Sequence, residues 1–515
     1  MFLTLCLVLS CTLVSFCRPP VNLDEAQNSK TKTSVDPLFQ YQWYLNNKEH
    51  PKEDINVLPV WQQGIYGRGI KILLIDDGVD VNHPDLKNRI DSNLQRVYPA
   101  TGGVRPNIHG TAMAGIIAAE RNNGEGVTGV APESTIIPDN LLLITNLKEK
   151  NIVYSLTKNI DKIDISVNSW GAQDFTGQFN TLGDSWFQSI EYGLKQGRNG
   201  KGTIYLWSAG NGASETEEID NSNYDGQANF YGVIAVCAVN KTGKRAVYSE
   251  KGANLWLCAP SSEKINGAGY GMFTTDVTDT GGMNNIGAPL DYKDLNYTKR
   301  FGGTSGAVAI TGAVVALMLE VNPNLGWRDV KIILAESARQ NDRLHTGWKT
   351  TNGKKISDGT YFQFSHEYGF GVVDAQKAVQ LSRHWQNVPA LVTTTFEALR
   401  HTSHSFHTKT HDTLVIAKSN IKYIEFIEIE TKWESNESGT LAIEIESPSG
   451  TIAKLTELHS CLKDLRKVKC QTPPLWRFGS SATLGENPEG TWKLRLHSTK
   501  DQHRLISWKI KIYGH

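Results

Sequence analysis

The sequence has no surplus of charge of either sign. Lysine plus arginine and aspartate plus glutamate number 53 each among its 515 residues. A chain without net charge has no general attraction to nucleic acid or to an anionic membrane surface, so we expect neither as a partner. The length suffices for about three domain-sized units, or for one large domain and a smaller one.

Cysteine is also scarce. The seven cysteines divide into three in the first 17 residues and four farther along: Cys6, Cys11, Cys17, Cys237, Cys258, Cys461 and Cys470. Cys237 and Cys258 flank a strand–turn–strand pattern, and Cys461 and Cys470 flank a short basic loop. These two candidate pairs suit an oxidising compartment, although the sequence leaves the pairing open.

Long hydrophobic runs are rare as well. The first run ends at Cys17, before Arg18, which is the length of a signal-peptide core rather than of a membrane span. We expect residues 1–17 to be a signal peptide and residues 18–35 a polar linker, with an uncleaved anchor and a lipid-modified Cys17 as the alternatives. The expected product is a soluble, exported protein without stable membrane insertion, secreted or, in a bacterium, periplasmic.

The second apolar run, Phe301–Pro323, is predicted to be a buried helix with Ser305 in its first turn. A hydroxyl there lies in the partial positive field of the helix N-terminus, near unpaired backbone N–H groups that stabilise an anion. An N-capping role on a core helix is the simpler interpretation of Ser305 taken alone. A membrane span is disfavoured by the length of the run, by Thr311 and by the terminal Glu320.

Strand and helix patterns alternate along residues 36–385. Apolar runs such as Ile70–Ile75 and Val233–Val239 indicate buried parallel strands, and segments such as Asn107–Ala119 and Gly183–Gly202 indicate helices. This alternation predicts an α/β domain with a doubly wound, mainly parallel sheet and helices on both faces.

The pattern changes after Trp385. Residues 386–515 hold short alternating segments joined by Pro, Gly and Ser turns, which predict a separate antiparallel β-sandwich. Four histidines between Arg400 and His411 have a spacing that suits a metal site on a helix, but their Thr- and Ser-rich context favours a polar linker.

Four residues of the α/β domain predict catalytic chemistry when taken together: Asp76, His109, Asn211 and Ser305. Each follows a predicted strand or begins a predicted helix, and open α/β sheets build their sites at such ends. A serine hydroxyl needs an imidazole to take its proton, and the imidazole needs a carboxylate to hold its tautomer. An amide can then stabilise the oxyanion. Each residue alone has an ordinary structural explanation, but the set predicts a nucleophilic serine site.

The blocks around these residues, DDG, NIHGTAMAG, SWG, SAGNG and GGTSG, resemble those of subtilisin-like serine proteases. Further details resemble the kexin/furin branch, the proprotein convertases, because LAIEIESPSGT, FGSSATLGENPEGTW and the closing IKIYG are similar to the P domain of that branch. The resemblance runs from Asp36 to His515. It implies a subtilisin-like catalytic domain over residues 36–385 and a P domain over residues 386–515.

The resemblance also assigns roles by position. It implies that Asp76 is the triad acid, His109 the general base, Ser305 the nucleophile and Asn211 the oxyanion donor. It implies that five residues bind a substrate with a basic residue before the scissile bond: Asp77, Ser169, Gly171, Asp174 and Asp225. It further implies two calcium sites with hard oxygen ligands, one formed by Asp36, Asp85 and Asn123 and the other by Asp174, Asp220 and Glu250.

Several positions depart from the family pattern near the substrate pockets: Pro106, Lys148, Asn151, Gln173 and Asn180. We therefore expect a required basic residue at the first substrate position, a preferred one at the second and weak selection beyond. Only a short segment separates the predicted signal peptide from Asp36, in place of the family's usual prodomain. This implies a separate folding chaperone or unaided folding, and a similarity to bacterial kexin-like proteases.

These observations favour a secreted, calcium-dependent serine endopeptidase that cuts protein or peptide substrates after basic residues and that we expect to be a monomer. A broad-specificity degradative or virulence protease is the second interpretation, favoured by the missing distal acids. An inactive protein-binding scaffold is the third, and the intact set of four site residues argues against it.

Overall fold

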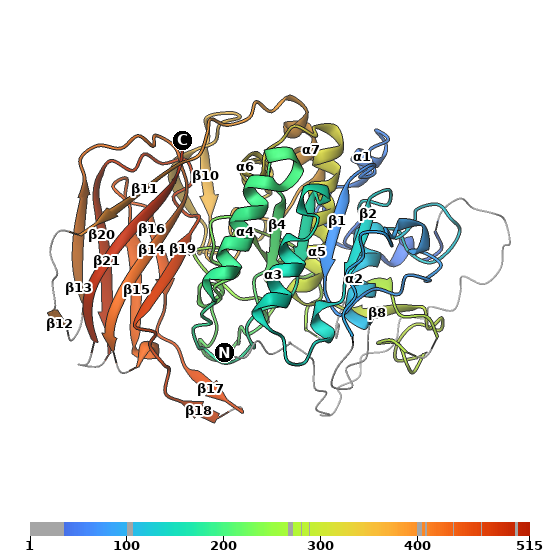
Figure 1. The fold of residues 1–515 in the computed structure, drawn as a ribbon, viewed down its shortest axis with the longest axis horizontal. Coiled ribbons are helices and arrows are strands. Elements are labelled where there is room, and N and C mark those ends of the chain that lie inside the picture. The colour runs from blue at the N-terminus through green and yellow to red at the C-terminus, as the bar shows by residue number, and fades with distance from the viewer. Residues whose placement is uncertain are drawn as a thin grey trace.

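A computed structural model describes residues 36–99, 107–265, 271–279, 281–287, 289–398, 404–406, 409–435, 437–464, 466–499 and 503–515. The predicted signal peptide at 1–17, the predicted linker at 18–35 and Pro106 lie outside the described residues. Within the described part the chain folds into an α/β domain followed by a β-sandwich (Figure 1).

Six parallel strands form the central sheet in the order β2-β1-β3-β4-β5-β6. Their bounds are β1 Lys71–Ile75, β2 Thr135–Asp139, β3 Ile165–Asn168, β4 Ile204–Ser208, β5 Val233–Val239 and β6 Leu257–Pro260. Nearly every residue of these strands is buried, as expected of a parallel sheet that is covered on both faces. The register places Ile75 opposite both Asp139 and Asn168, so the residues that follow β1 emerge at the carboxyl edge of the sheet. The predicted doubly wound sheet is confirmed.

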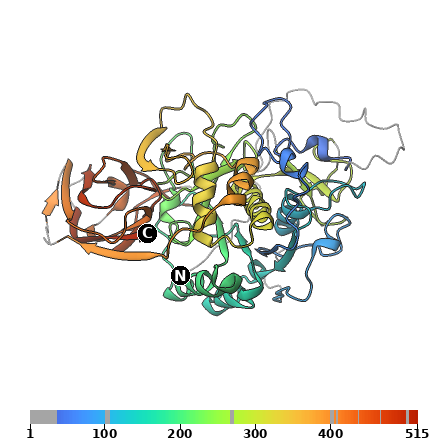
Figure 2. The ribbon, with the colours of Figure 1, turned by 90° about the horizontal axis from the view of Figure 1, so that it is seen from above.

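Helices cover both faces of this sheet. Among the described residues the α-helices are α1 Leu58–Trp61, α2 Ile108–Ala118, α3 Glu149–Thr157, α4 Asp184–Gln196, α5 Gly303–Val321, α6 Trp327–Ser337 and α7 Ala375–His384. Helix α5 packs against α2, α7 and strands β3 to β6, whereas α3 and α4 pack against each other on the opposite face (Figures 1 and 2). Helix α5 is long and apolar enough to cross a membrane, but 89% of its most apolar window is buried, so it is the core helix that the sequence predicts.

Short elements connect these layers. Two small antiparallel pairs are β7 Met272–Thr275 with β8 Tyr297–Phe301 and β9 Lys349–Lys354 with β10 Tyr361–Phe364. Strand β8 leads directly into α5. The 3₁₀ turns are η2 Phe39–Tyr41, η3 Lys87–Arg89, η4 Leu141–Leu143, η5 Ile160–Lys162, η6 Gly197–Gly200, η7 Ser222–Tyr224 and η8 Ser438–Thr440.

The C-terminal domain is an antiparallel β-sandwich. One sheet has the order β11-β21-β14-β19 with β12 paired to β21, and the other has the order β13-β20-β15-β16. A hairpin, β17–β18, stands apart from both sheets. The strand bounds are β11 Val392–Glu397, β12 His404–Phe406, β13 Lys409–Ile416, β14 Ile424–Ser435, β15 Leu441–Glu446, β16 Ile452–Thr456, β17 Cys461–Lys463, β18 Arg466–Val468, β19 Leu475–Ser480, β20 Gly490–Ser498 and β21 His503–Gly514.

One prediction for this domain is wrong. The segment Arg400–His411 was expected to be a polar linker, yet it contributes β12 and the start of β13. The reason is that β13 pairs with β20 along its whole length while burying only Leu414 and Ile416, so its polar residues do not reveal a strand. His401 and His407 of the four histidines lie outside the described residues.

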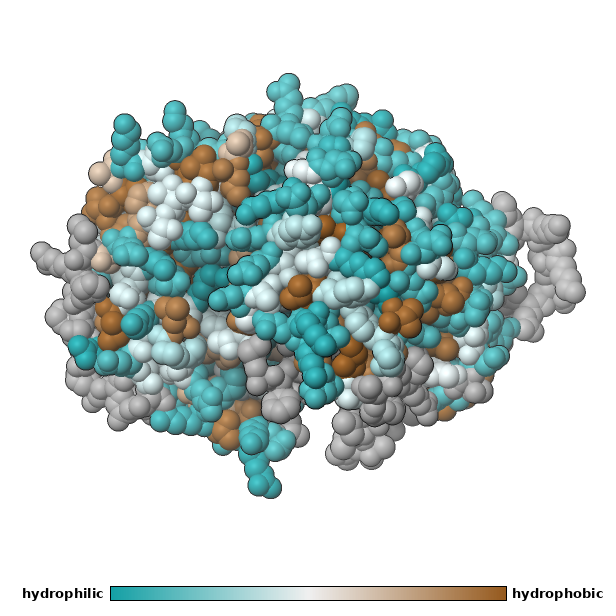
Figure 3. All heavy atoms as spheres, viewed as in Figure 1, coloured by the Kyte–Doolittle hydropathy of each residue, from teal (hydrophilic) through white to brown (hydrophobic). Residues whose placement is uncertain are grey.

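The two domains share one continuous hydrophobic core. At their interface the guanidinium of Arg328 pairs with the carboxylate of Glu425, and the side chain of Asn223 exchanges two hydrogen bonds with the backbone of Gly479. On the face shown in Figure 3 the apolar residues are scattered in small groups among polar ones.

Both candidate cysteine pairs form disulfides. Cys237 and Cys258 lie opposite each other on the parallel strands β5 and β6, and Cys461 and Cys470 close the β17–β18 hairpin.

Candidate active site

Asp76 and His109 meet at the carboxyl edge of the sheet. Asp76 follows β1, and His109 lies in the first turn of α2. The imidazole Nδ1 is 2.9 Å from both carboxylate oxygens of Asp76. Since a carboxylate only accepts, Nδ1 carries a proton, and in the neutral ring Nε2 is left with its lone pair. The His109 side chain is 34% exposed, so a substrate can reach the ring.

The charge of His109 is set by its neighbours. Burial disfavours the imidazolium, but the carboxylates of Asp76 and Asp77 together raise the pKa of His109 above its usual value of 6.5. A raised pKa makes the ring a stronger base, as proton abstraction from a hydroxyl requires.

Ser305 is brought to this pair by the β8–α5 connection. The last residue of β8, Phe301, places its ring 5.3 Å from the His109 ring, and Gly303 has a positive φ of 78° that turns the chain into α5. Ser305 then lies in the first turn of α5. Among the described residues its hydroxyl makes no hydrogen bond to His109; such contacts commonly tighten only when substrate binds.

Asn211 follows β4 and contacts the same connection. Its side-chain oxygen accepts hydrogen bonds from the backbone N–H and the hydroxyl of Thr304, at 2.8 and 2.9 Å. Within the described residues its Nδ2 has no partner. The amide oxygen is thus held by the residue before Ser305 while the N–H₂ group stays free to donate to an oxyanion. We call these four predicted catalytic residues, Asp76, His109, Asn211 and Ser305, the catalytic group.

Two predicted substrate residues lie beside the catalytic group. The carboxylate of Asp77 accepts hydrogen bonds from the backbone N–H groups of His109 and Gly110, so it caps the start of α2. Burial and the neighbouring Asp76 raise the pKa of Asp77 to about 7. The hydroxyl of Ser169 donates to Asp76 at 3.4 Å, and Gly171 follows two residues later, beyond β3.

Four acids line one small cavity next to Asn211: Asp174, Asp220, Asp225 and Glu250, which we call the acid cluster. The cavity has a volume of about 10 Å³, roughly the space that one water molecule or ion takes. Its ten lining residues include no lysine or arginine. Asp174 accepts the backbone N–H of Asn211 at 2.9 Å, so the acid cluster and the catalytic group are joined by a hydrogen bond.

The acids crowd together because glycine makes room for them. Gly210 has φ of 104°, and a Cβ at that position would lie 2.2 Å from a Glu250 carboxylate oxygen. Burial, with mutual repulsion, raises the pKa of Asp220 to about 7 and the pKa values of Asp225 and Glu250 well above their usual range. The carboxylate of Asp225 accepts no hydrogen bond from the described residues, in contrast to the carboxylates of Asp220 and Glu250.

The other predicted calcium site, formed by Asp36, Asp85 and Asn123, also offers oxygen ligands. Asp36 accepts backbone N–H groups from Asn122, Asn123 and Gly124, and Asp85 accepts the backbone N–H of Val127. Asn123 donates from Nδ2 to Asp85 at 2.8 Å, so its amide holds Asp85 rather than facing the same point with its oxygen. Burial raises the pKa of Asp36, and it raises that of Asp85 to about 6.

Comparison with known proteins identifies the family to which the chain belongs. The model of the subtilase family matches residues 67–371, which is more than half of the chain. The chain belongs to the subtilase family. A second model, the proprotein convertase P-domain, matches residues 424–512 of the same subtilase.

Curated relatives agree with both matches. The subtilase is 31% identical to kexin of Saccharomyces cerevisiae over 96% of its own length and 59% of kexin. It is also 31% identical to neuroendocrine convertase 2 of Drosophila melanogaster, over 93% of its own length and 72% of the convertase. The chain thus spans about three fifths of kexin and somewhat more of the convertase.

A solved structure confirms the fold. The subtilase superimposes on the serine protease of Aeromonas sobria, in its complex with a chaperone, with a TM-score of 0.79, 24% identity and coverage of 93% of this chain and 95% of that one. At this identity the likeness concerns the architecture, and it extends over both domains.

The acid cluster fits calcium by its chemistry. The residues that would hold the ion offer carboxylate oxygens, the cavity has the size of a single ion, and no lysine or arginine in the lining neutralises the acids. Buried carboxylates held this close are stable as anions only with a cation among them. Asp36 and Asp85 also offer hard oxygen ligands, though most of their capacity is already taken by backbone N–H groups.

Two residues of the site were not predicted from the sequence. Thr304 anchors the oxygen of Asn211, and Phe301 packs against His109. Both lie in or directly before the GGTSG motif, so the sequence indicates that they are near the site. Their contacts, however, join residues that are 93 and 192 positions apart in the chain, and a local sequence pattern does not predict such contacts.

Proposed function

We propose that this protein is a secreted serine endopeptidase that requires calcium and hydrolyses peptide bonds after arginine or lysine, preferably at dibasic sites. The observation that carries the proposal is the hydrogen bond from Asn211 N to Asp174, which joins a catalytic group to a cluster of four acids. Membership of the subtilase family and the relatives named kexin and neuroendocrine convertase 2 support the same assignment.

The catalytic group supplies the bond-breaking chemistry. The Ser305 oxygen attacks the scissile carbonyl carbon while His109 Nε2 takes the hydroxyl proton and Asp76 holds the resulting imidazolium. The carbonyl oxygen becomes an anion, to which Asn211 Nδ2 donates. The C–N bond then breaks as His109 returns its proton to the leaving amine, and water repeats the sequence to release Ser305.

The acid cluster supplies recognition. A substrate guanidinium or ammonium satisfies buried carboxylates that an apolar side chain would leave unpaired. Asp225 is the acid best suited to this contact, because it is half-buried and the described residues give its carboxylate no hydrogen bond. When calcium is bound, it supplies two positive charges to the cluster, and Asp174, Asp220 and Glu250 are the residues that would hold it.

Selection at the second substrate position should be weaker. Asp77 is the predicted partner of a second basic residue, but both of its oxygens already accept N–H groups of α2. An anion so engaged attracts a further cation less than a free one does. We therefore assign a strict requirement to the first position and a preference to the second.

Export and a separate folding chaperone stay predictions of the sequence. The structural neighbour from Aeromonas sobria was solved with a chaperone, which makes coexpression with a neighbouring gene a sensible step in preparing the protein.

The test is cleavage of a fluorogenic peptide panel that varies the two residues before the bond. Purified protein and its Ser305→Ala variant are compared with calcium and with chelator. Cleavage confined to peptides with arginine or lysine at the first position, and lost in the variant and in chelator, is the expected result. Equal cleavage after apolar residues would contradict the specificity and favour a degradative protease, and failure of a serine-reactive phosphonate to label Ser305 would favour a binding scaffold.

A further inference from the structure

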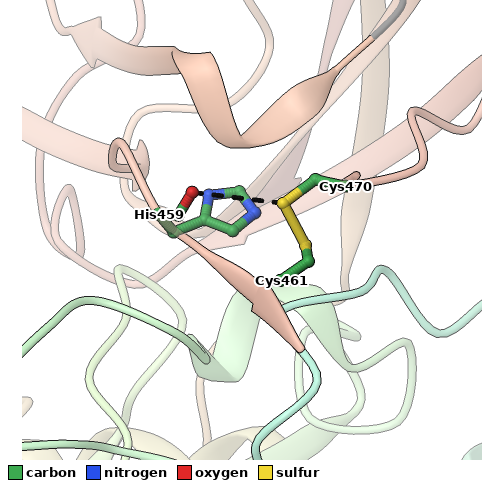
Figure 4. Close-up of side chains that lie close together, drawn as sticks. All are labelled: His459, Cys461 and Cys470. Atoms are coloured by element: carbon green, nitrogen blue, oxygen red, sulfur yellow. Dashed lines mark hydrogen bonds between the residues drawn. A yellow bond between two sulfur atoms is a disulfide. The ribbon is translucent and has the colours of Figure 1, made fainter. Parts of the chain in front are cut away.

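The β17–β18 hairpin of the P domain lies against the catalytic domain beside the acid cluster. Figure 1 shows this hairpin reaching out from the sandwich, and the disulfide Cys461–Cys470 closes it. At its base the imidazole of His459 lies beside the disulfide (Figure 4). Both cysteines are buried, so the base of the hairpin is packed, while the residues of β18 are exposed.

The hairpin and the residues beside it form hydrogen bonds with oxygen atoms of the loop Thr176–Gln178. The backbone N–H of Leu462 donates to Thr176 O at 3.0 Å. His459 Nε2 lies 3.1 Å from Gly177 O. In the neutral tautomer with its proton on Nε2 the ring donates to this carbonyl, and Nδ1 then accepts from the Tyr224 hydroxyl at 3.0 Å. The side-chain oxygen of Gln178 accepts the backbone N–H of Gln471 at 2.9 Å.

The same loop binds the acid cluster through its backbone N–H groups. The backbone N–H groups of Thr176 and Gly177 donate to the two carboxylate oxygens of Asp220, at 3.2 and 2.5 Å. Asp174 lies two residues before Thr176 in the same segment. The peptide units around Gly177 are therefore fixed between the P domain on one side and Asp220 on the other.

The segment that leads to Asp220 also contacts the hairpin, through Glu217 and Glu218. The backbone N–H of Ser460 donates to Glu218 O at 2.8 Å, two residues before Asp220. The carboxylate of Glu217 accepts the Ser460 hydroxyl at 2.9 Å and pairs with Lys467 at 2.7 Å. Both segments that carry Asp174 and Asp220 are thus bound to one hairpin.

Gly177 shows how closely the loop and the hairpin approach. Its φ is 64°, and a Cβ at this position would lie 2.3 Å from Ser460 O and 3.1 Å from Cys461 Sγ. No side chain fits between them without moving the hairpin away. This close approach is independent of the hydrogen bonds and agrees with them.

We propose that the disulfide-closed hairpin is a positioning element of the acid cluster: through Gly177 and His459 it sets the geometry in which Asp174 and Asp220 bind a divalent cation and a basic substrate residue. The proposal rests on the proposed function for the identity of the substrate residue. No hydrogen bond joins the described residues of the hairpin to the catalytic group, so in this proposal the hairpin acts only through the acids.

The first test is Gly177→Ala, with Gly359→Ala as the matched control. Gly359 has φ of 70° and open space around it, so its substitution introduces the same backbone strain without a clash. We expect the calcium concentration at half-maximal rise of the melting temperature to increase about fivefold in Gly177→Ala, the size of roughly one lost hydrogen bond, and to stay unchanged in Gly359→Ala. KM for an arginine peptide should rise with it, while kcat changes little.

Further variants keep the proposal testable if Gly177→Ala does not fold. Joint substitution of Cys461→Ser and Cys470→Ser opens the hairpin and should shift the calcium midpoint in the same direction. His459→Leu removes the donor to Gly177 O and should do likewise, whereas His459→Gln retains an N–H and should remain close to wild type.

The outcomes separate this proposal from the function itself. Thermal unfolding needs no catalysis, so a calcium shift that moves with the hairpin variants in a protein that cleaves nothing supports the positioning role and contradicts the proposed activity. Equal calcium midpoints for wild type, Gly177→Ala and the cysteine pair, with arginine peptides cleaved normally, would overturn the positioning role alone. A wild-type melting temperature that ignores calcium would overturn both.

Discussion

In the catalytic group the protein supplies partners that hold His109 and Asn211, whereas in the acid cluster it places like charges together. Asp76 holds His109, and Thr304 holds the oxygen of Asn211. Asp220, Asp225 and Glu250 instead repel one another in a cavity without a lysine or arginine. From this difference we expect the first region to work without a further group and the second to need a cation. Four predictions test this contrast, starting with the largest expected effect.

Removing the amide donor should damage the catalytic group without touching recognition. We expect Asn211→Ala to lower kcat about 100- to 1000-fold, because one oxyanion donor is lost, and to leave KM for arginine peptides within a small factor of wild type. Steady-state kinetics in saturating calcium measure both values. A rise in KM as large as the fall in kcat would show that Asn211 serves binding instead.

Removing one acid of the acid cluster should instead affect KM more than kcat. We expect Asp225→Asn to lower kcat/KM for arginine peptides roughly 30-fold or more, since losing one partner of a buried charge pair costs about 2 kcal/mol or more. The loss should appear in KM and should be smaller for peptides with an apolar first residue. Asp161→Asn, at an exposed acid, is the matched control, and an equal loss in that variant would contradict the assignment.

A milder change tests how the catalytic group is held. Thr304→Val keeps the backbone N–H that binds Asn211 but removes the hydroxyl that donates to it at 2.9 Å. We expect kcat to fall about fivefold, as for one neutral hydrogen bond. An unchanged kcat would show that the backbone contact alone positions Asn211.

The acid cluster should also govern stability against pH when calcium is absent. The pKa of Asp220 is raised to about 7 in the folded chain, and those of Asp225 and Glu250 are raised as well. Groups whose folded pKa is raised favour the folded state at low pH and lose that contribution as pH rises through the folded pKa. The melting temperature in chelator should therefore fall by a few degrees between pH 5 and pH 8, and calcium should raise it more at pH 8. A calcium effect that is independent of pH would contradict this.

The sequence predicted the members of the site better than their connections. Asp76, His109, Asn211 and Ser305 stand in recognisable motifs at strand and helix ends, and the structure brings His109 to Asp76 and the Ser305 segment to Asn211. The contacts of Gly177 with Ser460 and Cys461 were not predictable, because they depend on how two domains pack across more than 280 residues of chain.

The elements of the fold also differ in how well the sequence predicts them. Buried strands such as Val233–Val239 are apolar throughout and were predictable, since both faces of a parallel sheet are covered. Strand β13 was mistaken for part of a linker because it buries only Leu414 and Ile416 and exposes most of its polar residues. Its pairing with β20 supplies the order that its own composition does not indicate.

The most direct test of the contrast between the two regions is a calcium titration read by two assays on one sample. One assay is the rate at which a small serine-reactive phosphonate labels Ser305, and the other is cleavage of an arginine peptide, both at a temperature where the chelated protein is still folded by circular dichroism. We predict that chelation abolishes most peptide cleavage, by raising KM, and slows labelling only slightly. Loss of labelling in parallel with cleavage, in a protein that remains folded, would contradict the account, because the catalytic group would then depend on the cation as much as the acid cluster does.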